Sequence, residues 1–314
     1  MRLVTDRSAL KGISFENTVA TIGVFDGVHL GHQEVIRRLT EIKETEGRDT
    51  SILLTFDRHP LSVTHPEMVP PLLTTLEEKI SILARLNVDT ILVEHFSEET
   101  ACLDYRAFIS TRLIGELGLR HLVVGYDFHL GAGREGSQER IVEEGTRSGF
   151  NVTIVPPVVL GGRAISSTRI RKAITERKLD QAARYLGRVY FFDAKVTSGE
   201  KVGRKLDFPT ANLTVSEGGK LLPPSGVYAV DTEVEGSTYG GMMNIGTAPT
   251  IHGDGRHRIE VHLFDFSGDL YGKRIRVSCR AFVRCEKKFK SSQELQLQLV
   301  RDREKVLRIL EKKS

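Results

Sequence analysis

The chain has 314 residues, a formal net charge of +4, and 39% hydrophobic and 27% charged residues. These values describe an ordinary globular protein, and the length predicts two domains. The mild positive charge suits anionic small molecules, but without a clustered basic stripe it does not indicate a nucleic-acid-binding protein. We see no apolar signal core and no apolar run of about 18 residues, so we expect neither export nor a membrane span. The 3 cysteines form no CxxC pair, which predicts a reducing, cytoplasmic location.

The first part of the chain alternates strand and helix patterns. Strands are expected at residues 19–25, 51–56, 90–93, 121–124 and 152–155, and helices at 33–46, 76–86, 105–117 and 137–148. This alternation predicts an α/β domain with a parallel sheet covered on both faces. In such sheets ligands bind at the carboxyl ends of the strands.

After about residue 186 the pattern changes to short β-branched and aromatic runs separated by turn residues. Strands are expected at residues 191–196, 226–234, 238–244, 259–264 and 274–282, and a final helix at 293–311. This spacing predicts a small antiparallel barrel. We place the domains at residues 1–184 and 185–314.

The stretch at residues 21–32 joins the first expected strand to the first expected helix. His29 and His32 are three residues apart, so they can face the same way at the positive end of the helix. Glycines let a ligand approach the backbone closely, so the stretch describes a phosphate site. The alternative is two loop histidines near a helix cap. The ligand-binding residues predicted here are Gly23, Phe25, Asp26, Gly27 and Gly31.

A second phosphate-binding element is expected at residues 165–171, where hydroxyl groups and two arginines meet a helix start. Thr168 is the expected cap of that helix. The alternative is an ordinary Ser/Thr cap followed by arginine, a common sequence.

The half of the chain expected to form the barrel contains its own candidate metal-binding and catalytic residues. Thr210 and Asn212 lie two residues apart on an extended segment, so both can offer oxygen ligands to Mg²⁺ on ATP. Glu260 shares a strand face with His262, and we expect it on the inner face of the barrel as a general base. The alternatives are a polar turn for the first pair and a structural salt bridge for Glu260.

Seven motifs in series resemble the bacterial bifunctional riboflavin kinase/FAD synthetase family. They are G-x-F-D-G-x-H-x-G-H, F-x-x-H-P, G-x-D-F, I-S-S-T-x-I-R, G-R-x-x-x-F-P-T-A-N, N-I-G-x-x-P-T and E-x-H-x-x-D-F. The resemblance covers essentially the whole chain. It implies a nucleotidyltransferase domain that adenylylates FMN with ATP, releasing FAD and pyrophosphate, followed by a domain that phosphorylates riboflavin to FMN.

The resemblance also implies roles for individual residues. In the first domain, His29 and His32 stabilise charge on the phosphates, and the other residues implied there are Phe56, His59, Pro60, Asp127, Ser167, Thr168 and Arg171. In the second domain, Thr210 and Asn212 hold Mg²⁺ and Glu260 is the base. The nucleotide- and flavin-binding residues implied there are Gly199, Gly203, Arg204, Lys205, Asn244, Arg284 and Phe289.

The expected ligands are therefore ATP, Mg²⁺, riboflavin and FMN, with no nucleic acid and no membrane. The oligomeric state stays open between a monomer and a weak homo-oligomer. Two alternatives are an enzyme with one of the two activities and a flavin-binding regulator on an inactive scaffold. Three departures from the family pattern are Arg58 in place of proline, Asp207 in place of glycine, and Leu130 where an aromatic residue is more usual. We expect Asp207 at worst to weaken nucleotide affinity.

Overall fold

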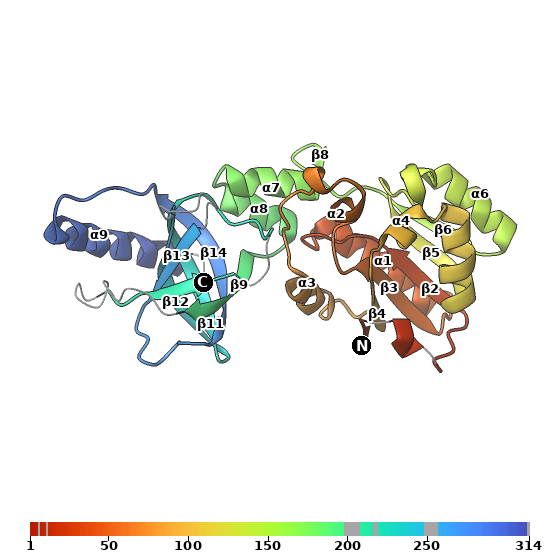
Figure 1. Ribbon diagram of the computed structural model, residues 1–314, viewed down its shortest axis with the longest axis horizontal. Helices are drawn as coiled ribbons and strands as arrows, with labels where there is room; N and C mark the ends of the chain where they lie inside the picture. The colour runs from red at the N-terminus through yellow and green to blue at the C-terminus, as the bar shows by residue number, and fades with distance from the viewer. Residues whose placement is uncertain (6, 11, 198–207, 216–218, 248–256, 313–314) are drawn as a thin grey trace. The chain divides into compact units, whose positions relative to one another are not determined.

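The computed structural model describes residues 1–314 apart from residues 6, 11, 198–207, 216–218, 248–256 and 313–314 (Figure 1). The chain forms two compact units, Met1–Ser167 and Thr168–Ser314. The two units are compact bodies, and their boundary does not show which residues serve which activity. The domain boundary at 184/185 therefore stays a prediction.

The first unit is built on a six-stranded sheet in the order β1-β4-β3-β2-β5-β6. All of its pairings are parallel, which confirms the predicted α/β architecture. The strands are β1 (Arg2–Val4), β2 (Thr18–Ile22), β3 (Thr50–Phe56), β4 (Thr90–Glu94), β5 (Leu119–Gly125) and β6 (Asn151–Val155). The edge strand β1 was not predicted, because three residues are too few to display a strand period.

Helices pack against this sheet, and its central strands β2, β3 and β4 bury side chains on both faces. The helices are α1 (Leu30–Thr45), α2 (Leu61–Thr64), α3 (Leu76–Leu83), α4 (Glu98–Cys102), α5 (Tyr105–Ala107), the π-helix η3 (Phe108–Glu116) and α6 (Gln138–Ser148). Short 3₁₀ turns lie at Arg7–Leu10, Pro66–Met68 and Ala132–Arg134, and a small hairpin joins β7 (Val159–Leu160) to β8 (Arg163–Ala164).

The segment 105–117 differs from the predicted α-helix. It begins as α5 and continues as the π-helix η3. The hydroxyls of Ser110 and Thr111 both donate to the Ala107 carbonyl, at 3.2 and 2.6 Å. Such side-chain hydrogen bonds compete with the backbone hydrogen bonds of a regular α-helix, and they occur where the helix changes to the π form.

The second unit contains a closed antiparallel barrel in the order β10-β13-β12-β11-β14-β9, as predicted. Its elements are α7 (Ser167–Thr175), α8 (Leu179–Leu186), β9 (Tyr190–Thr197), β10 (Ala211–Thr214), β11 (Gly226–Val234), β12 (Ser237–Thr247), β13 (His257–Leu263), β14 (Arg274–Arg284) and α9 (Ser292–Glu311). Tyr228, Met243 and Val261 belong to the buried cluster of the barrel interior. A separate cluster joins Phe264 and Val283 to Val306 of α9, on the outside of the wall (Figure 1).

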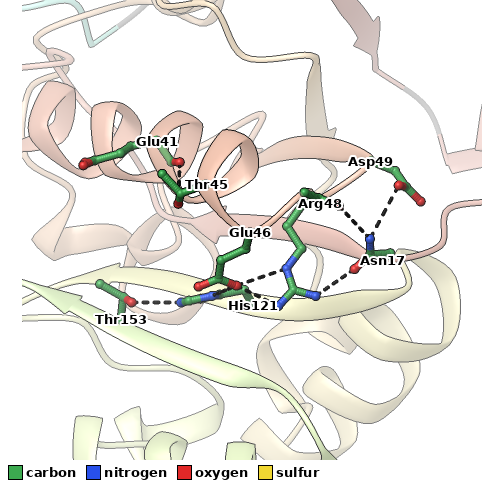
Figure 2. Close-up of polar contacts among 9 residues, drawn as sticks. Asn17, Glu41, Thr45, Glu46, Arg48, Asp49, His121 and Thr153 are labelled. Carbon is green, nitrogen blue, oxygen red and sulfur yellow. Dashed lines mark hydrogen bonds and ion pairs between the residues drawn. The ribbon is translucent and has the colours of Figure 1, made fainter.

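A polar cluster joins α1 to the amino ends of the strands in the first unit (Figure 2). His121 is 4% exposed and lies between the Glu46 carboxylate at 3.0 Å and the Thr153 hydroxyl at 2.8 Å. Arg48 donates to the same carboxylate at 2.7 Å and to the Asn17 side-chain oxygen at 2.7 Å. The cluster ties the end of α1 to the sheet edge opposite the carboxyl ends of the strands.

Within the described part of the chain, no helix combines the length and apolar character that crossing a bilayer requires. The thiols of Cys102, Cys279 and Cys285 are all free, as the absence of a disulfide framework predicted. Burial raises the pKa of the Cys279 thiol to about 12.

Candidate functional site

The loop between β2 and α1 has an unusual backbone. Phe25 and Val28 adopt positive φ angles of 51° and 38°, and Gly27 one of 83°. Phe25 is 4% exposed and Val28 is fully buried. A bulky or β-branched residue in the left-handed region is strained, and such strain persists where surrounding structure fixes a functional loop.

The two histidines of this loop lie together at the start of α1. His29 is the helix cap, and its Nδ1 accepts a bond of 3.3 Å from the backbone N–H of His32. Their rings stack with centroids 3.6 Å apart, and Phe25 meets the His32 ring edge-on at 5.3 Å. A Cβ on Gly31 would come within 3.2 Å of the His29 ring, so glycine leaves room for that ring. The arrangement presents imidazole groups at the positive end of a helix.

The Asp26 carboxylate is buried and engaged with the protein's own backbone. It accepts bonds from the N–H groups of Leu73 (2.9 Å) and Thr74 (3.0 Å). The Ser167 hydroxyl donates to the Asp26 carbonyl at 2.9 Å, so the structure brings these two predicted site residues together. Asp26 thus shapes the loop, and direct binding of a ligand by its carboxylate stays a prediction.

The loop after β3 lies at the carboxyl edge of the strand beside β2. Phe56 is 8% exposed and packs edge-on against Phe96, with centroids 5.1 Å apart. His59 uses Nδ1 to accept from the Leu61 N–H at 3.2 Å, and Pro60 precedes the short helix α2. Asp127 is exposed just after β5, the other neighbour of β2. Together with the β2–α1 loop, these residues therefore lie at the carboxyl ends of the three adjacent strands β3, β2 and β5.

Thr168 and Arg171 lie on α7, in the second compact unit. The prediction that Thr168 caps this helix was wrong, because the helix begins at Ser167 and places Thr168 in its first turn. The Thr168 side chain is exposed, and that of Arg171 is half-buried.

In the barrel, three polar residues occupy one row across neighbouring strands. Glu260 on β13 is paired in register with Asn212 on β10 and with Asn244 on β12. Directly opposed residues of an antiparallel pair project from the same face of the sheet. The carboxylate therefore stands between two amides.

The expected position of Glu260 on the inner face of the barrel was wrong. Ile259 and Val261 join the buried interior cluster, so strand alternation places Glu260 on the outer face. The interior excludes it because an unpaired carboxylate among apolar side chains is costly. Two nitrogens of the Arg258 guanidinium lie 2.9 and 2.8 Å from Oε1 of the Glu260 carboxylate. This ion pair is the structural alternative raised above.

The His262 side chain binds the backbone next to Thr210. Its Nδ1–H donates to the Pro209 carbonyl at 2.8 Å, and its ring packs edge-on against Phe208 with centroids 5.2 Å apart. Burial lowers the pKa of His262. His262 thereby supports the segment that carries both predicted magnesium ligands.

Arg284 is the last residue of the barrel strand β14, and Phe289 lies in the segment between β14 and α9. The Arg284 guanidinium binds the buried Asp302 carboxylate of α9 at 2.7–3.1 Å and lies 5.8 Å from the centre of the Phe289 ring. Glu286 accepts a bond of 3.3 Å from the Asn244 amide. Glu286 and Asp302 were not predicted, because each lies in a stretch of the sequence with no chemical motif.

Several predicted residues cannot be placed. Gly199, Gly203, Arg204, Lys205 and Asp207 fall outside the described residues. Among the residues that the structure does describe, no group of three or more His, Cys, Asp or Glu side chains could hold a metal ion.

A parallel sheet with an imidazole-bearing helix start, followed by a closed barrel with a carboxylate between amides, defines an enzyme that transfers phosphoryl or nucleotidyl groups. The FAD synthetase family model matches residues 13–169, and the riboflavin kinase family model matches residues 186–310. The chain belongs to the family of bifunctional riboflavin kinase/FMN adenylyltransferases.

Relatives of that description are similar along nearly their whole length. The chain is 38% identical to the one from Escherichia coli strain K12, over 96% of each chain. It is 39% identical to the one from Listeria monocytogenes, over 91% of this chain and 90% of the relative. A crystal structure described as a macrolide-efflux protein from Streptococcus pneumoniae superposes with a TM-score of 0.86 at 30% identity, covering 97% of this chain and 98% of that one.

Proposed function

We propose that each unit performs one of two consecutive reactions, phosphorylation of riboflavin in the barrel and adenylylation of FMN at the carboxyl edge of the parallel sheet. One observation carries this proposal: each unit has its own constellation suited to phosphate chemistry. These are the stacked histidines of α1 and the row of Asn212, Glu260 and Asn244.

In the barrel, the 5′-hydroxyl of riboflavin attacks the γ-phosphorus of ATP. A new P–O bond forms, the bond to ADP breaks, and the hydroxyl proton passes to Glu260. Because the Arg258 guanidinium is bound to the Glu260 carboxylate, this ion pair must break before Glu260 can accept the proton.

We assign Thr210 and Asn212 to a magnesium ion. A hydroxyl and a side-chain amide oxygen are hard donors of the kind Mg²⁺ accepts, and both lie on the segment that His262 supports. The ion would neutralise charge on the ATP phosphates.

In the first unit, a phosphate oxygen of FMN attacks the α-phosphorus of ATP, and pyrophosphate leaves. The nucleophile is already an anion, so this step needs charge stabilisation and not a strong base. His29 and His32 supply that stabilisation at the positive end of α1. The Ser167 hydroxyl, which donates to the Asp26 carbonyl of the same loop, is the further group of this unit that we assign to phosphate binding. Thr168 and Arg171 belong to the second unit, and their roles stay predictions.

The test is incubation with riboflavin, ATP and Mg²⁺, followed by chromatographic separation of riboflavin, FMN and FAD over time. We expect FMN to form and then convert to FAD, with both steps lost on chelation of magnesium. Accumulation of FMN without FAD would refute the adenylylation step. No conversion of riboflavin or of added FMN would leave a flavin-binding regulator as the better description.

A further inference from the structure

A buried lysine lies directly behind the phosphate-binding loop of the first unit. Lys79 is 6% exposed and belongs to α3, which begins with a capping box made by Thr75 and Glu78. Its side chain lies on the same buried stripe as Ile82 and Leu83. Lysine is seldom this buried, and it is tolerated where its three donors all find acceptors.

The Lys79 ammonium joins the carboxyl ends of two neighbouring strands. It donates to the Val24 carbonyl at 3.2 Å, to the Thr55 hydroxyl at 3.0 Å and to the Phe56 carbonyl at 2.8 Å. Val24 leads directly into the left-handed residue Phe25, and Phe56 leads into the loop of His59. One side chain therefore fixes two loops that carry predicted site residues.

The residues just before α3 hold the other side of the same loop. The Leu73 and Thr74 N–H groups bind the Asp26 carboxylate, and the Gly27 N–H donates to the Thr74 hydroxyl at 3.0 Å. The segment Leu73–Lys79, which we name the α3 clamp, thus grips the β2–α1 loop before and after Phe25. Left-handed backbone is unfavourable at a non-glycine residue, so this loop needs such external bonds to keep its shape.

We propose that Lys79 is a positioning residue for adenylyl transfer: through the α3 clamp it holds the β2–α1 loop, and with it His29 and His32, in the working arrangement. The proposal rests on the function proposed above. It assigns to α3 a role in the FMN-to-FAD step and none in the riboflavin-to-FMN step. The ammonium also adds positive charge close to the loop that binds phosphate.

The experiment compares Lys79→Met and Lys79→Arg in the full chain. We expect Lys79→Met to lower kcat for FMN-to-FAD conversion about 100-fold, the effect that small misplacement of reacting groups produces, with a smaller change in KM. Lys79→Arg keeps the cation and should recover at least about tenfold of that loss. Riboflavin phosphorylation by the same chain should stay within about twofold of the parent, since α3 lies outside the barrel unit.

A matched control is Lys220→Met, which removes a lysine that is also buried (8% exposed) but lies in the barrel unit and donates to the Phe191 carbonyl. We expect FMN-to-FAD conversion to be unaffected.

If Lys79→Met fails to fold, a second variant tests the same loop. Thr74→Val removes the acceptor of the Gly27 N–H and should lower kcat for FMN-to-FAD conversion about tenfold without loss of fold. A folded Lys79→Met or Thr74→Val variant with parental kcat would overturn the proposal.

The ring signals of the histidines in NMR spectra provide a readout that needs no turnover. Lys79→Met should shift the signals of His29 and His32 and leave that of His262 unchanged. Unchanged His29 and His32 signals would overturn the clamp. A parent chain that makes no FAD would refute the proposed function, while shifted histidine signals in the variant would still support the clamp.

Discussion

The two candidate sites are built in opposite ways. In the first unit the site is a buried, strained loop whose shape is fixed by backbone hydrogen bonds, a helix cap and stacked rings. In the barrel the site is a row of side chains on the outer face of a strand, and its carboxylate is held by Arg258. In the proposed functions, adenylyl transfer in the first unit needs fixed charge, whereas phosphorylation in the barrel needs a base that can be released from its ion pair. The two designs match these different demands.

The largest effect should come from removing the barrel's carboxylate. We expect Glu260→Ala to slow riboflavin phosphorylation about 1000-fold, the loss typical of a general base, with FMN-to-FAD conversion unchanged. Glu233→Gln, at an exposed carboxylate on β11, is the control and should leave both steps intact. A Glu260→Ala rate within about tenfold of the parent would mean that the ion pair with Arg258 is purely structural.

The next largest effect should come from the helix start in the other unit. His29→Asn keeps a good capping side chain and removes the imidazole. We expect FMN-to-FAD conversion to fall about 100-fold, with the melting temperature and riboflavin phosphorylation unchanged. His65→Asn, at an exposed position of the same unit, should have no effect. If both reactions fell in His29→Asn, the two sites would not be independent.

Most of the fold could be predicted from the sequence, because the strand and helix periods of its longer elements are unambiguous. Sequence patterns singled out the β2–α1 loop, Asn212 and Glu260, but not the pairing of Asn212 with Glu260 in register. Sequence alternation assigned Glu260 and Ile259 to opposite faces but could not say which face was inside. That choice depends on the closure of the barrel, a property of all six strands together.

The α3 clamp was missed for a similar reason. Lys79 is three and four residues before Ile82 and Leu83, so its place on the buried stripe was visible in the sequence. Its partners, Val24 and Phe56, are backbone carbonyls, and no side-chain pattern reveals which carbonyls a lysine will reach.

A smaller effect should separate geometry from stability within the first site. In Gly31→Ala the new Cβ would press on the His29 ring at 3.2 Å, while alanine favours the helix by about 1 kcal/mol over glycine. We therefore expect FMN-to-FAD conversion to fall about tenfold with unchanged or higher stability. Thr40→Ala on the same helix is the control for helix propensity. Parental activity in Gly31→Ala would show that the His29 ring has room to move.

The smallest effect should come from the cluster at the opposite sheet edge, where we expect a change in stability and none in catalysis. Burial raises the pKa of Glu46, but its bonds to His121 and Arg48 outweigh burial, so the pKa lies below its ordinary value of 4.5. A carboxyl group with a lowered pKa stabilises the fold above about pH 4.5, and that contribution is lost as the pH falls through the folded-state pKa.

Glu46→Gln should therefore lower the melting temperature at pH 7 by about 2–4 °C, equivalent to about 1 kcal/mol for a carboxylate that is one-third exposed. The deficit should start to shrink below about pH 4.5 and vanish once the pH has fallen through the lower folded-state pKa, where the parent carboxylate is also neutral. Both flavin reactions should keep parental rates, and Glu44→Gln, at an exposed position of α1, should match the parent at every pH. An equal deficit at pH 4 and pH 7 would assign the loss to packing instead of charge, because a loss of charge interaction must shrink as the parent carboxylate is protonated.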